Sequence, residues 1–255
     1  RELSKDYPAE KINTFIEVMP ARYFLTTSEP EILEHFALMD QFRGTGAVTS
    51  VSHFPEKDCS SVVVCTSDRP GLFAAITGVL AAMRLDILNA RIFTATDDRI
   101  LDVFRVSHHG KPETVISDAK WAKFRSTLEG VLEGEIDVAR LVASSGTSTL
   151  LQKRLPKVTT SVQIDNEAAE DFTIVEVFTA DRIGVLFTIT YTLHQLGLSI
   201  HVAKISTNVD QVADVFYVTD ENGAKIEAPA RLEQIKQALY LKLAPQDETT
   251  AQAVH

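Results

Sequence analysis

Cysteine is scarce in this chain of 255 residues, which contains only Cys59 and Cys65. Two thiols cannot supply a disulfide framework or a four-thiolate zinc site, so we interpret both as reduced structural residues. Long apolar runs are also missing, although a membrane-spanning helix needs about 20 consecutive apolar residues. The composition therefore predicts a globular protein with no membrane segment.

Positive charge is in deficit: 25 Lys and Arg stand against 35 Asp and Glu, so the net charge is −10. Nucleic acid binds clustered Lys and Arg, so we do not expect it as a partner. No basic segment followed by an apolar one marks a signal peptide, and together with the reduced thiols this favours a cytoplasmic protein. The chain begins with Arg rather than Met, so we expect a fragment or a processed chain.

The motifs of the common enzyme classes are absent from the sequence, which has no P-loop, nucleophile elbow, H-E-x-x-H helix or G-x-G-x-x-G turn. His108 and His109 are neighbours on an extended segment and point to opposite sides, so we interpret them as a solvated turn. The cluster of Glu167, Glu170 and Asp171 lacks a spaced ligand set and is interpreted as a solvated loop. An independent enzyme is therefore the least favoured function class.

An internal repeat organises the chain. The segment from Val62 to Thr94 recurs 113 residues later, with 14 of 33 positions identical. The identities include Asp68/Asp181, Arg69/Arg182 and Gly71/Gly184, and further on Asp102-Val-Phe104 matches Asp214-Val-Phe216. A period this long indicates a duplicated domain rather than a solenoid.

Each copy shows the same order of predicted elements. In the first copy, a β-branched run from Val62 to Thr66 predicts a buried strand. Apolar spacing from Pro70 to Arg84 predicts a helix that begins at the proline. An alternating hairpin from Ile87 to Ser107 and a second helical stripe from Trp121 to Leu132 follow. With one more alternating segment before each copy, the unit is β-β-α-β-β-α.

The predicted fold class is α+β, with two ferredoxin-like βαββαβ sandwiches in tandem, in permuted order, after a short helical segment. We place the domains at 47–142 and 158–244, with a small, polar linker at 143–157 and a C-terminal tail at 245–255. Residues 1–46 are interpreted as the helical tail of an upstream domain, with Ser28 as a helix cap. Because two helices cover only one face of a sheet, we expect the copies to pair with each other or with another chain, as in a homo-oligomer.

The corner between the first strand and the first helix of each repeat carries the candidate site. Asp68-Arg-Pro-Gly71 and Asp181-Arg-Ile-Gly184 each place a carboxylate, a guanidinium and a glycine at a helix N-terminus. Free N–H groups there can bind a carboxylate, glycine permits close approach, and the Asp can pair with an ammonium group. This combination suits an α-amino acid, and a well-capped turn is the alternative.

The candidate ligand-binding residues extend from the corner to the facing strand, and none of them is predicted to be catalytic or to bind metal. In the first copy they are Asp68, Arg69, Pro70, Gly71, Leu72, Asn89 and Ile92, and in the second they are Asp181, Arg182, Gly184, Val185, His201 and Lys204. A ligand-independent module that docks on a catalytic domain or another subunit is the competing interpretation.

The motif Asp68-Arg-Pro-Gly-Leu-Phe-Ala-Ala-Ile-Thr-Gly-Val-Leu80 resembles the signature of ACT domains, small regulatory modules that commonly bind amino acids. The second copy matches less fully, because Ile183 replaces the usual proline. Three segments together resemble the C-terminal part of the bifunctional PII uridylyltransferase/uridylyl-removing enzymes: Met19-Pro-Ala-Arg-Tyr-Phe-Leu25, Asp165-Asn-Glu-Ala168 and Asp181-Arg-Ile-Gly-Val-Leu-Phe-Thr-Ile-Thr190. This resemblance covers nearly the whole chain.

The resemblance implies a sensor of nitrogen status. In that family a Mg-dependent nucleotidyltransferase domain adds UMP to the PII protein, an HD phosphohydrolase domain removes it, and glutamine acting on the ACT pair favours removal. The present chain has neither the G-S and D-x-D pair nor the H…HD…D set of those domains. It is therefore expected to be a regulatory region without a cofactor of its own, which binds glutamine and acts on PII through the catalytic domains of its parent chain.

Two further expectations follow. The first copy is the better ligand site, because its Asp-Arg-Pro-Gly sequence matches the ACT motif in full. Ligand binding is expected to shift one copy against the other or against the upstream domain, since a ligand moves an equilibrium by its differential affinity for two states. A rigid pair of copies is the alternative.

Overall fold

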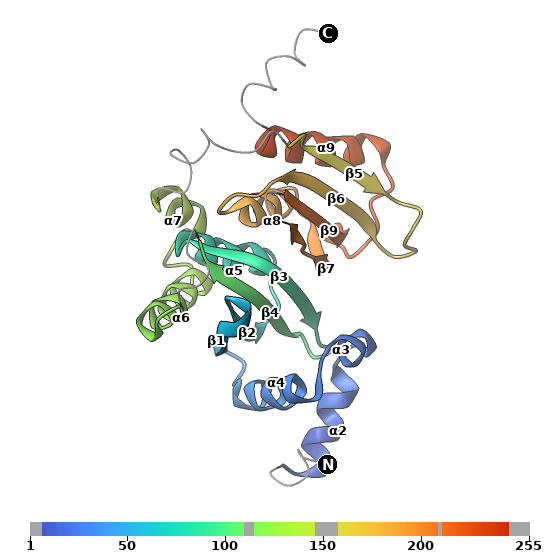
Figure 1. Ribbon diagram of the computed structural model, residues 1–255. Helices are drawn as coiled ribbons and strands as arrows, with labels where there is room; N and C mark the ends of the chain where they lie inside the picture. The colour runs from blue at the N-terminus through green and yellow to red at the C-terminus, as the bar shows by residue number, and fades with distance from the viewer. Residues whose placement is uncertain (1–6, 110–114, 146–157, 209–210, 245–255) are drawn as a thin grey trace, which may run out of the picture.

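The chain folds into two similar α+β units, one above the other in Figure 1, with a group of N-terminal helices below them. The computed structural model describes residues 7–109, 115–145, 158–208 and 211–244. The first unit contains β1 (Ala47–Phe54), the single-turn helix η1 (Pro55–Lys57), β2 (Cys59–Ser67), α5 (Leu72–Ala82), β3 (Leu85–Thr94), β4 (Arg99–His108) and α6 (Asp118–Leu132). A short helix, α7 (Val138–Ser144), follows α6.

The second unit repeats this order. It contains β5 (Ser161–Asp165), β6 (Thr173–Ala180), α8 (Val185–Gln195), β7 (Ser199–Lys204), β9 (Gln211–Thr219) and α9 (Pro229–Leu243), and the short β8 (Thr207–Asn208) pairs with β9. The strand orders are β1-β2-β4-β3 and β5-β6-β9-β7, and all neighbouring strands are antiparallel. This arrangement confirms the predicted pair of ferredoxin-like units.

The start of α5 and the end of α7 differ from the sequence expectation. α5 begins at Leu72 rather than at Pro70, because Gly71 is its N-cap and has a φ of +76°, a left-handed conformation outside the helical region. α7 extends to Ser144, into the segment expected to be a linker. The rest of that linker from residue 146 to 157, and the tail at 245–255, lie outside the described residues.

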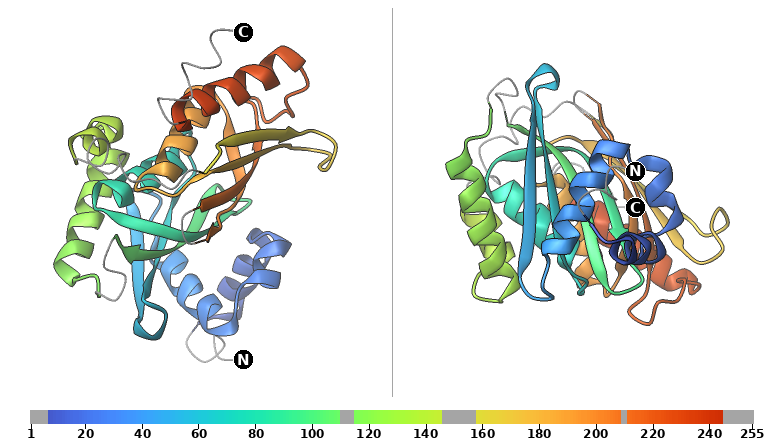
Figure 2. Two further views of the ribbon diagram at one scale, coloured as in Figure 1. Left: turned by 45° about the horizontal axis from the view of Figure 1, so that its top comes forward. Right: turned by 90° about the horizontal axis from the view of Figure 1, so that it is seen from below.

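The N-terminal helices α2 (Ala9–Val18), α3 (Ala21–Thr26) and α4 (Glu29–Gln41) cover the face of the first sheet that α5 and α6 leave open (Figures 1 and 2). Their apolar side chains pack on Cys65 and Leu101 of that sheet. From the sequence we interpreted this segment as the helical tail of an upstream domain, but it has a partner within this chain. It gains one because alternate residues of β2 and β4 present a second apolar row on the outer face.

The cap of α4 agrees with the sequence. The Glu31 carboxylate accepts hydrogen bonds from the Ser28 backbone N–H at 2.9 Å and from the Ser28 hydroxyl at 2.8 Å. These bonds form a capping box that fixes the start of the helix at the serine expected to be its cap.

The two units contact each other through equivalent elements. α5 packs on α8, and β3 lies beside β7. Thr77 and Thr190, which occupy equivalent positions in the repeat, share a hydrogen bond of 3.1 Å between their hydroxyl oxygens. One apolar core continues through both units. The expected pairing between the copies is therefore present within a single chain.

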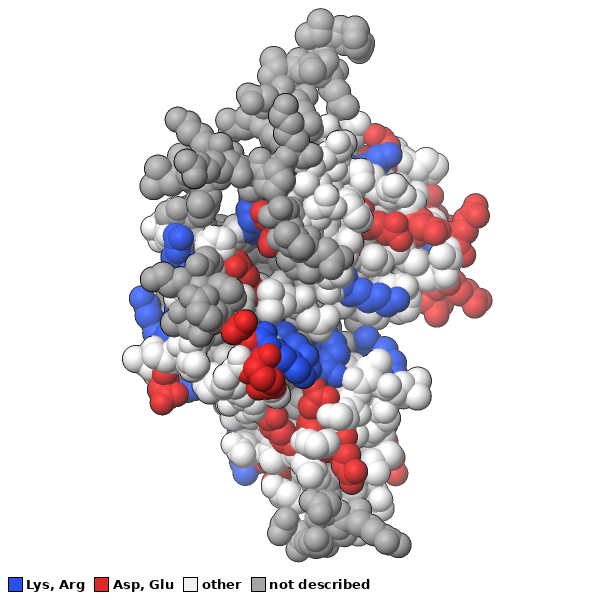
Figure 3. Space-filling view, viewed as in Figure 1, with Lys and Arg blue, Asp and Glu red and all other residues white. Residues whose placement is uncertain are grey.

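The remaining sequence interpretations concern the surface and the thiols. His109 bonds Asp86 at 2.8 Å and His108 bonds Lys120 at 3.1 Å, so the two rings do not converge, although both are half-buried rather than fully solvated. Glu167, Glu170 and Asp171 are exposed, and acidic side chains gather at the tip of the β5–β6 connection in Figure 3. Both cysteines are free, and no helix among the described residues is long and apolar enough to cross a membrane.

Candidate functional site

A cavity of about 380 Å³ opens at the first corner, between α5 and the second unit. Its volume lies in the range of about 300–1,000 Å³ that is typical of small-molecule sites. Most of the predicted first-copy residues line it, namely Asp68, Arg69, Pro70, Gly71, Leu72 and Ile92. The fold therefore brings this part of the sequence-predicted site together.

The second unit supplies the opposite wall of this cavity through Thr190, His194, Leu198, Ser199, Ile200 and His201. We expected His201 at the corner of its own copy, but it faces the first corner because β7 lies beside β3. Two other predicted residues do not line either corner. Asn89 donates to the Ile205 carbonyl at 3.3 Å, and the Lys204 ammonium donates to the Tyr217 hydroxyl at 3.2 Å.

The equivalent corner of the second unit is nearly closed. Asp181, Arg182, Gly184 and Val185 line a space of only about 20 Å³ together with Thr77, Ala81, Leu85, Asp86 and Ile87. That volume is about enough for one water molecule. Ile183 stands where the first unit has Pro70. It is only 6% exposed and packs with Ala81, Phe187 and side chains of α7.

Both arginines of the corner motifs point away from the ligand position. The Arg69 guanidinium donates to the Leu132 carbonyl at 2.7 Å, and the Arg182 guanidinium donates to the Leu243 carbonyl at 3.3 Å. Each therefore satisfies a carbonyl at the C-terminal end of the last helix of its unit, where cations are also favoured by the helix dipole. Their repeated presence is explained by this structural role.

Gly71 holds the first corner close to the second unit. A Cβ at this position would lie 2.7 Å from Nε2 of His194, whereas a Cβ at Gly184 would lie 3.6 Å from Ala81. Both glycines have a positive φ, +76° at Gly71 and +78° at Gly184. The two corners therefore share one backbone conformation and differ in the side chains that face it.

Family models match each of the two units. Residues 60–120 match the model described as ACT domain, and residues 168–244 match the model described as ACR family N-terminal ACT domain. The chain carries two ACT domains. We call the unit from β1 to α6 ACT1 and the unit from β5 to α9 ACT2.

Curated relatives extend the similarity to nearly the whole chain. It is 32% identical over 254 residues to the bifunctional uridylyltransferase/uridylyl-removing enzyme of Bradyrhizobium sp. strain BTAi1, an alignment that covers 99% of this chain and 27% of the relative. The enzymes of the same name from Phenylobacterium zucineum and Azospirillum brasilense are 33% and 37% identical, over 93% and 72% of this chain and 25% and 20% of their own length.

The chain thus spans about a quarter of the length of the relatives that it matches. Its two ACT domains and this partial coverage are consistent with the C-terminal regulatory region of such an enzyme. Both findings support a regulatory role for this part of the protein.

Carboxyl groups dominate the charge around the ACT1 cavity. Partial burial raises the pKa of Asp68, and nearby Asp98 raises it further, while His201 has the opposite effect. Burial also lowers the pKa of the His201 imidazole. The Arg69 guanidinium points to α6, so it does not pair with the carboxyls of the cavity. The cavity therefore favours ligands that bring their own hydrogen-bond donors.

One carboxyl of the cavity was not assigned to the site from the sequence. Asp102 lines the cavity, is only 1% exposed, and has no hydrogen-bond partner for Oδ1 among the described residues. Burial raises the pKa of Asp102 well above its usual range. Its strand neighbours on the same face, Ile100 and Phe104, belong to the apolar core. The signal available in the sequence was an Asp in a core row of the strand, repeated as Asp214.

Asp214 lies in the closed ACT2 corner. Its Oδ1 accepts a hydrogen bond from the Ser206 N–H at 3.2 Å, while Oδ2 has no partner among the described residues. Burial raises the pKa of Asp214 to about 7. The repeat therefore preserves a buried carboxyl at both corners, but only Asp102 faces a cavity of ligand size.

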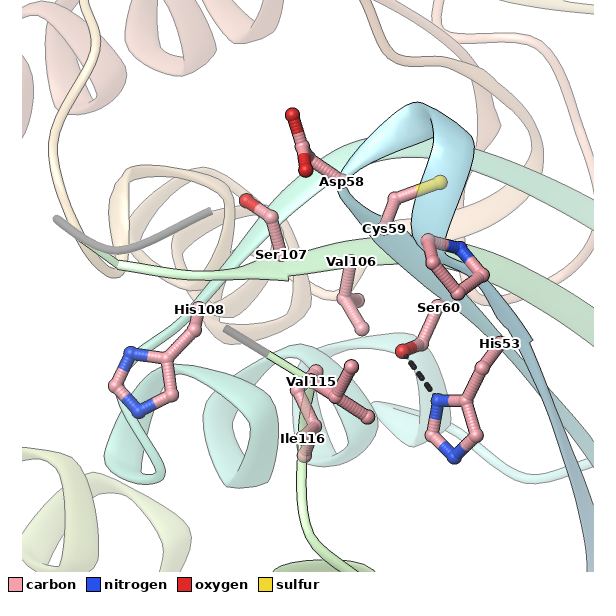
Figure 4. Close-up of a pocket in the computed structure, with 10 residues that line it drawn as sticks. His53, Asp58, Cys59, Ser60, Val106, Ser107, His108, Val115 and Ile116 are labelled. Carbon is pink, nitrogen blue, oxygen red and sulfur yellow. Dashed lines mark hydrogen bonds between the residues drawn. The ribbon is translucent and has the colours of Figure 1, made fainter. Parts of the chain in front are cut away.

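A second hollow of ACT1, shown in Figure 4, lies at the opposite ends of the same strands and measures only about 20 Å³. His53 bonds the Ser60 hydroxyl there at 2.9 Å, and the His108 ring points away from His53. No group of three or more His, Cys, Asp or Glu side chains in the described part of the chain is placed to hold a metal ion. The ACT1 cavity is therefore the stronger candidate for ligand binding.

Proposed function

We propose that this chain is an amino-acid-sensing regulatory region that binds free glutamine in the ACT1 cavity. The observation that carries the proposal is the combination of a ligand-sized cavity with a helix N-terminus on one side and carboxyls on the other. No side chain caps α5, and the Leu72 N–H already bonds the Arg69 carbonyl at 3.2 Å. The N–H groups of Phe73 and Ala74 in the first turn are therefore left to bind the carboxylate of an amino acid.

Polar side chains from both ACT domains suit the amide of glutamine. Thr94 and Ser199 carry hydroxyls and His194 carries ring nitrogens at the cavity wall, whereas the Thr190 hydroxyl already bonds Thr77 and Nε2 of His201 already bonds the Thr219 hydroxyl. A carboxamide donates and accepts hydrogen bonds at once, and Thr94, Ser199 and His194 can supply both partners. Because residues of both ACT domains line the cavity, the site can close around one amino acid held between the two domains.

The size of the two corners supports one ligand per chain. The ACT2 corner offers about 20 Å³, compared with about 380 Å³ at the ACT1 corner. Ile183 fills the second corner with an apolar side chain that is buried in the core. A ligand could enter this corner only if Ile183 left its buried position, and a cavity left in a core is destabilising.

The relatives suggest what this binding controls. They are named bifunctional uridylyltransferase/uridylyl-removing enzymes, so we infer that glutamine occupancy sets the balance between uridylylation and deuridylylation of the PII signalling protein by the parent enzyme. The chain contributes the sensor, and catalytic domains elsewhere in the parent chain contribute the chemistry.

Arg22 provides a route from the cavity to the N-terminal helices. It lies on α3, its guanidinium carbon is 5.3 Å from the centre of the Phe93 ring, and it donates to the His201 carbonyl at 3.0 Å. The helices packed on ACT1 are thereby tied to the ACT2 strand that lines the cavity. A ligand that draws β7 toward α5 would change this contact, and so the position of the helices.

Calorimetric titration of the chain with L-glutamine tests the proposal. We expect saturable binding of one glutamine per chain, with weaker binding of L-glutamate because an additional carboxylate would enter a cavity rich in carboxyls. If the chain binds none of the common amino acids, the proposal is contradicted.

Arg22→Ala tests the route. In the wild-type chain, glutamine should increase hydrogen-exchange protection of α2 to α4, and the variant should lose this increase while it still binds. Arg91→Ala is the matched control, because Arg91 joins the same helices to β3 of ACT1 through its bonds to Thr26 and Glu31. Equal responses of both variants would exclude Arg22 as the connection.

A ligand-independent docking role is the second candidate, and it is favoured by the outer face of the ACT2 sheet. Phe178 is 46% exposed there, whereas Cys65 at the equivalent position of ACT1 is buried under the N-terminal helices. If docking alone were the function, Phe178→Ser would weaken assembly with the catalytic domains in the parent protein while glutamine had no effect on it. Assembly that depends on glutamine would favour the sensor.

A further inference from the structure

The buried carboxyl of Asp102 is only partly satisfied within the protein, because a hydrogen bond from the Phe93 backbone N–H leaves one of its oxygens without a partner among the described residues. It occupies a core row of β4 between Ile100 and Phe104. An unpartnered buried carboxyl is unfavourable by an amount comparable to a lost hydrogen bond or more. Such a group in a folded protein calls for a specific reason, and here the group lines a ligand-sized cavity.

The neighbouring charges leave Asp102 available to a ligand. Arg22 is close enough to influence it electrostatically, but this guanidinium donates to the His201 carbonyl and forms no ion pair with Asp102. Asp68, from the loop before α5, is the other charged group that affects Asp102, and it has the same sign. The local field therefore favours a positively charged partner that comes from the cavity.

We propose that Asp102 is the ammonium-binding residue of the ACT1 site and pairs with the α-ammonium group of a bound amino acid. This inference rests on the proposed function and assigns the ammonium to the strand carboxyl rather than to the corner carboxyl Asp68. Asp68 is much more exposed to solvent than Asp102, and ion pairs of exposed groups contribute little, whereas Asp102 can accept a charge-assisted hydrogen bond in a desolvated environment.

The assignment orients the ligand. The carboxylate of the amino acid lies at the first turn of α5, the ammonium lies at Asp102 on the sheet, and the side chain extends toward ACT2. Ligand recognition would then need both domains: ACT1 holds the groups common to all α-amino acids, and residues such as His194 and Ser199 of ACT2 contact the side chain. The site class is a zwitterion site with a separate side-chain pocket.

ACT2 supplies a matched control. Asp214 is the repeat equivalent of Asp102, and both are 1% exposed. Asp214 faces a space of about 20 Å³. The same substitution at the two positions thus removes the same chemical group from a similar environment, and only one of the two groups faces the ligand.

The experiment is a double-mutant cycle between protein and ligand, measured by calorimetry. The probes are L-glutamine and glutaramic acid, which is the same molecule with hydrogen in place of the α-amino group. For the wild-type chain we expect glutaramic acid to bind about 10- to 100-fold more weakly, the range for a hydrogen bond to a charged group. Asp102→Asn should bind glutamine about equally weakly and should no longer distinguish the two ligands. Asp214→Asn should behave like the wild type.

The outcomes separate this inference from the proposed function. If the wild-type chain binds no amino acid, the proposed function is wrong. If it binds glutamine, but Asp102→Asn keeps the wild-type preference over glutaramic acid, only the role of Asp102 is wrong. If Asp102→Asn fails to fold, equal affinity of the wild-type chain for glutamine and glutaramic acid would still overturn the assignment. A large preference of the wild-type chain for glutamine that is lost in Asp102→Ser would support it.

Discussion

The two ACT corners share a backbone conformation and a motif, but only one of them encloses a cavity. Gly71 and Gly184 have nearly the same positive φ, and each follows an Asp-Arg pair whose arginine bonds the last helix of its domain. The difference arises from a few side chains: Pro70 is exposed where Ile183 is buried. A duplicated fold can thus keep its framework while binding is confined to one copy.

The neighbouring segments reinforce this difference. α7 packs against Ile183 and Phe187 beside the ACT2 corner, and the N-terminal helices reach the ACT2 wall of the ACT1 cavity through Arg22. The open corner is therefore the one connected to the rest of the chain. This connection is what a regulatory site requires, because coupling needs contacts that differ between the free and bound states.

The largest expected effect comes from adding a side chain to each corner glycine. Gly71→Val should reduce glutamine affinity at least 100-fold, because its Cβ would meet His194 at 2.7 Å in the wall of the cavity. Gly184→Val should leave the affinity within about threefold. Each variant should lose about 1–3 kcal/mol of stability, since a β-branched residue is strained at positive φ.

Calorimetry and chemical denaturation of both variants check this prediction. Their similar loss of stability serves as the control, because it separates an effect on the cavity from an effect on folding. A larger loss of affinity in Gly184→Val would place the ligand in ACT2.

The second prediction concerns the residue that closes the ACT2 corner. Ile183→Ala should lower the free energy of unfolding by about 2–4 kcal/mol, because it removes methyl groups from a buried cluster. Pro70→Ala, at the equivalent position of ACT1, should change it by less than about 1 kcal/mol, because Pro70 is exposed. Urea denaturation measures both values. Equal losses would mean that the two corners are packed alike, contrary to the structure.

The third prediction concerns a pH dependence due to Asp214. Its folded-state pKa of about 7 lies above the value of about 3.9 for an unfolded aspartate. Between these values the folded state binds the proton more strongly, so this group lowers stability as the pH rises from about 4 to 7, by on the order of 1 kcal/mol per pH unit. Asp214→Asn should remove that contribution.

The measurement is the stability difference between Asp214→Asn and the wild-type chain, which should grow from pH 4 to pH 7 and then level off. His35, whose pKa burial lowers to about 4, changes stability in the opposite direction but is present in both proteins and cancels. A difference that does not vary with pH would contradict the buried position of Asp214.

Much of the fold and part of the site follow from the sequence. The repeat, the strand alternation and the helical spacing predict both sandwiches, because each periodicity reports directly on one buried face. The sequence also predicts the ACT1 corner from Asp68 to Leu72. It could not predict that His201 belongs to the ACT1 cavity, because that depends on how β7 packs beside β3 rather than on any local pattern.

Three other features also depended on packing. The arginines of the corner motif were expected to serve the ligand, but they bond helix ends about 60 residues away, as in the contact between Arg69 and Leu132. In the sequence, Asp102 stands at a position where the strand alternation predicts a buried apolar residue. Only the cavity beside it in the structure gives its carboxyl a role. The N-terminal helices carry an apolar stripe, but their partner is a sheet face formed by strands far along the chain.

Hydrogen exchange with and without saturating glutamine tests the difference between the two corners most directly. Binding at ACT1 predicts increased protection at the start of α5, at residues 100–102 of β4 and at residues 198–201, with no change at residues 181–186 of ACT2. Increased protection at residues 181–186 without any at the start of α5 would contradict binding at ACT1, and equal protection of both corners would contradict the restriction of binding to one copy.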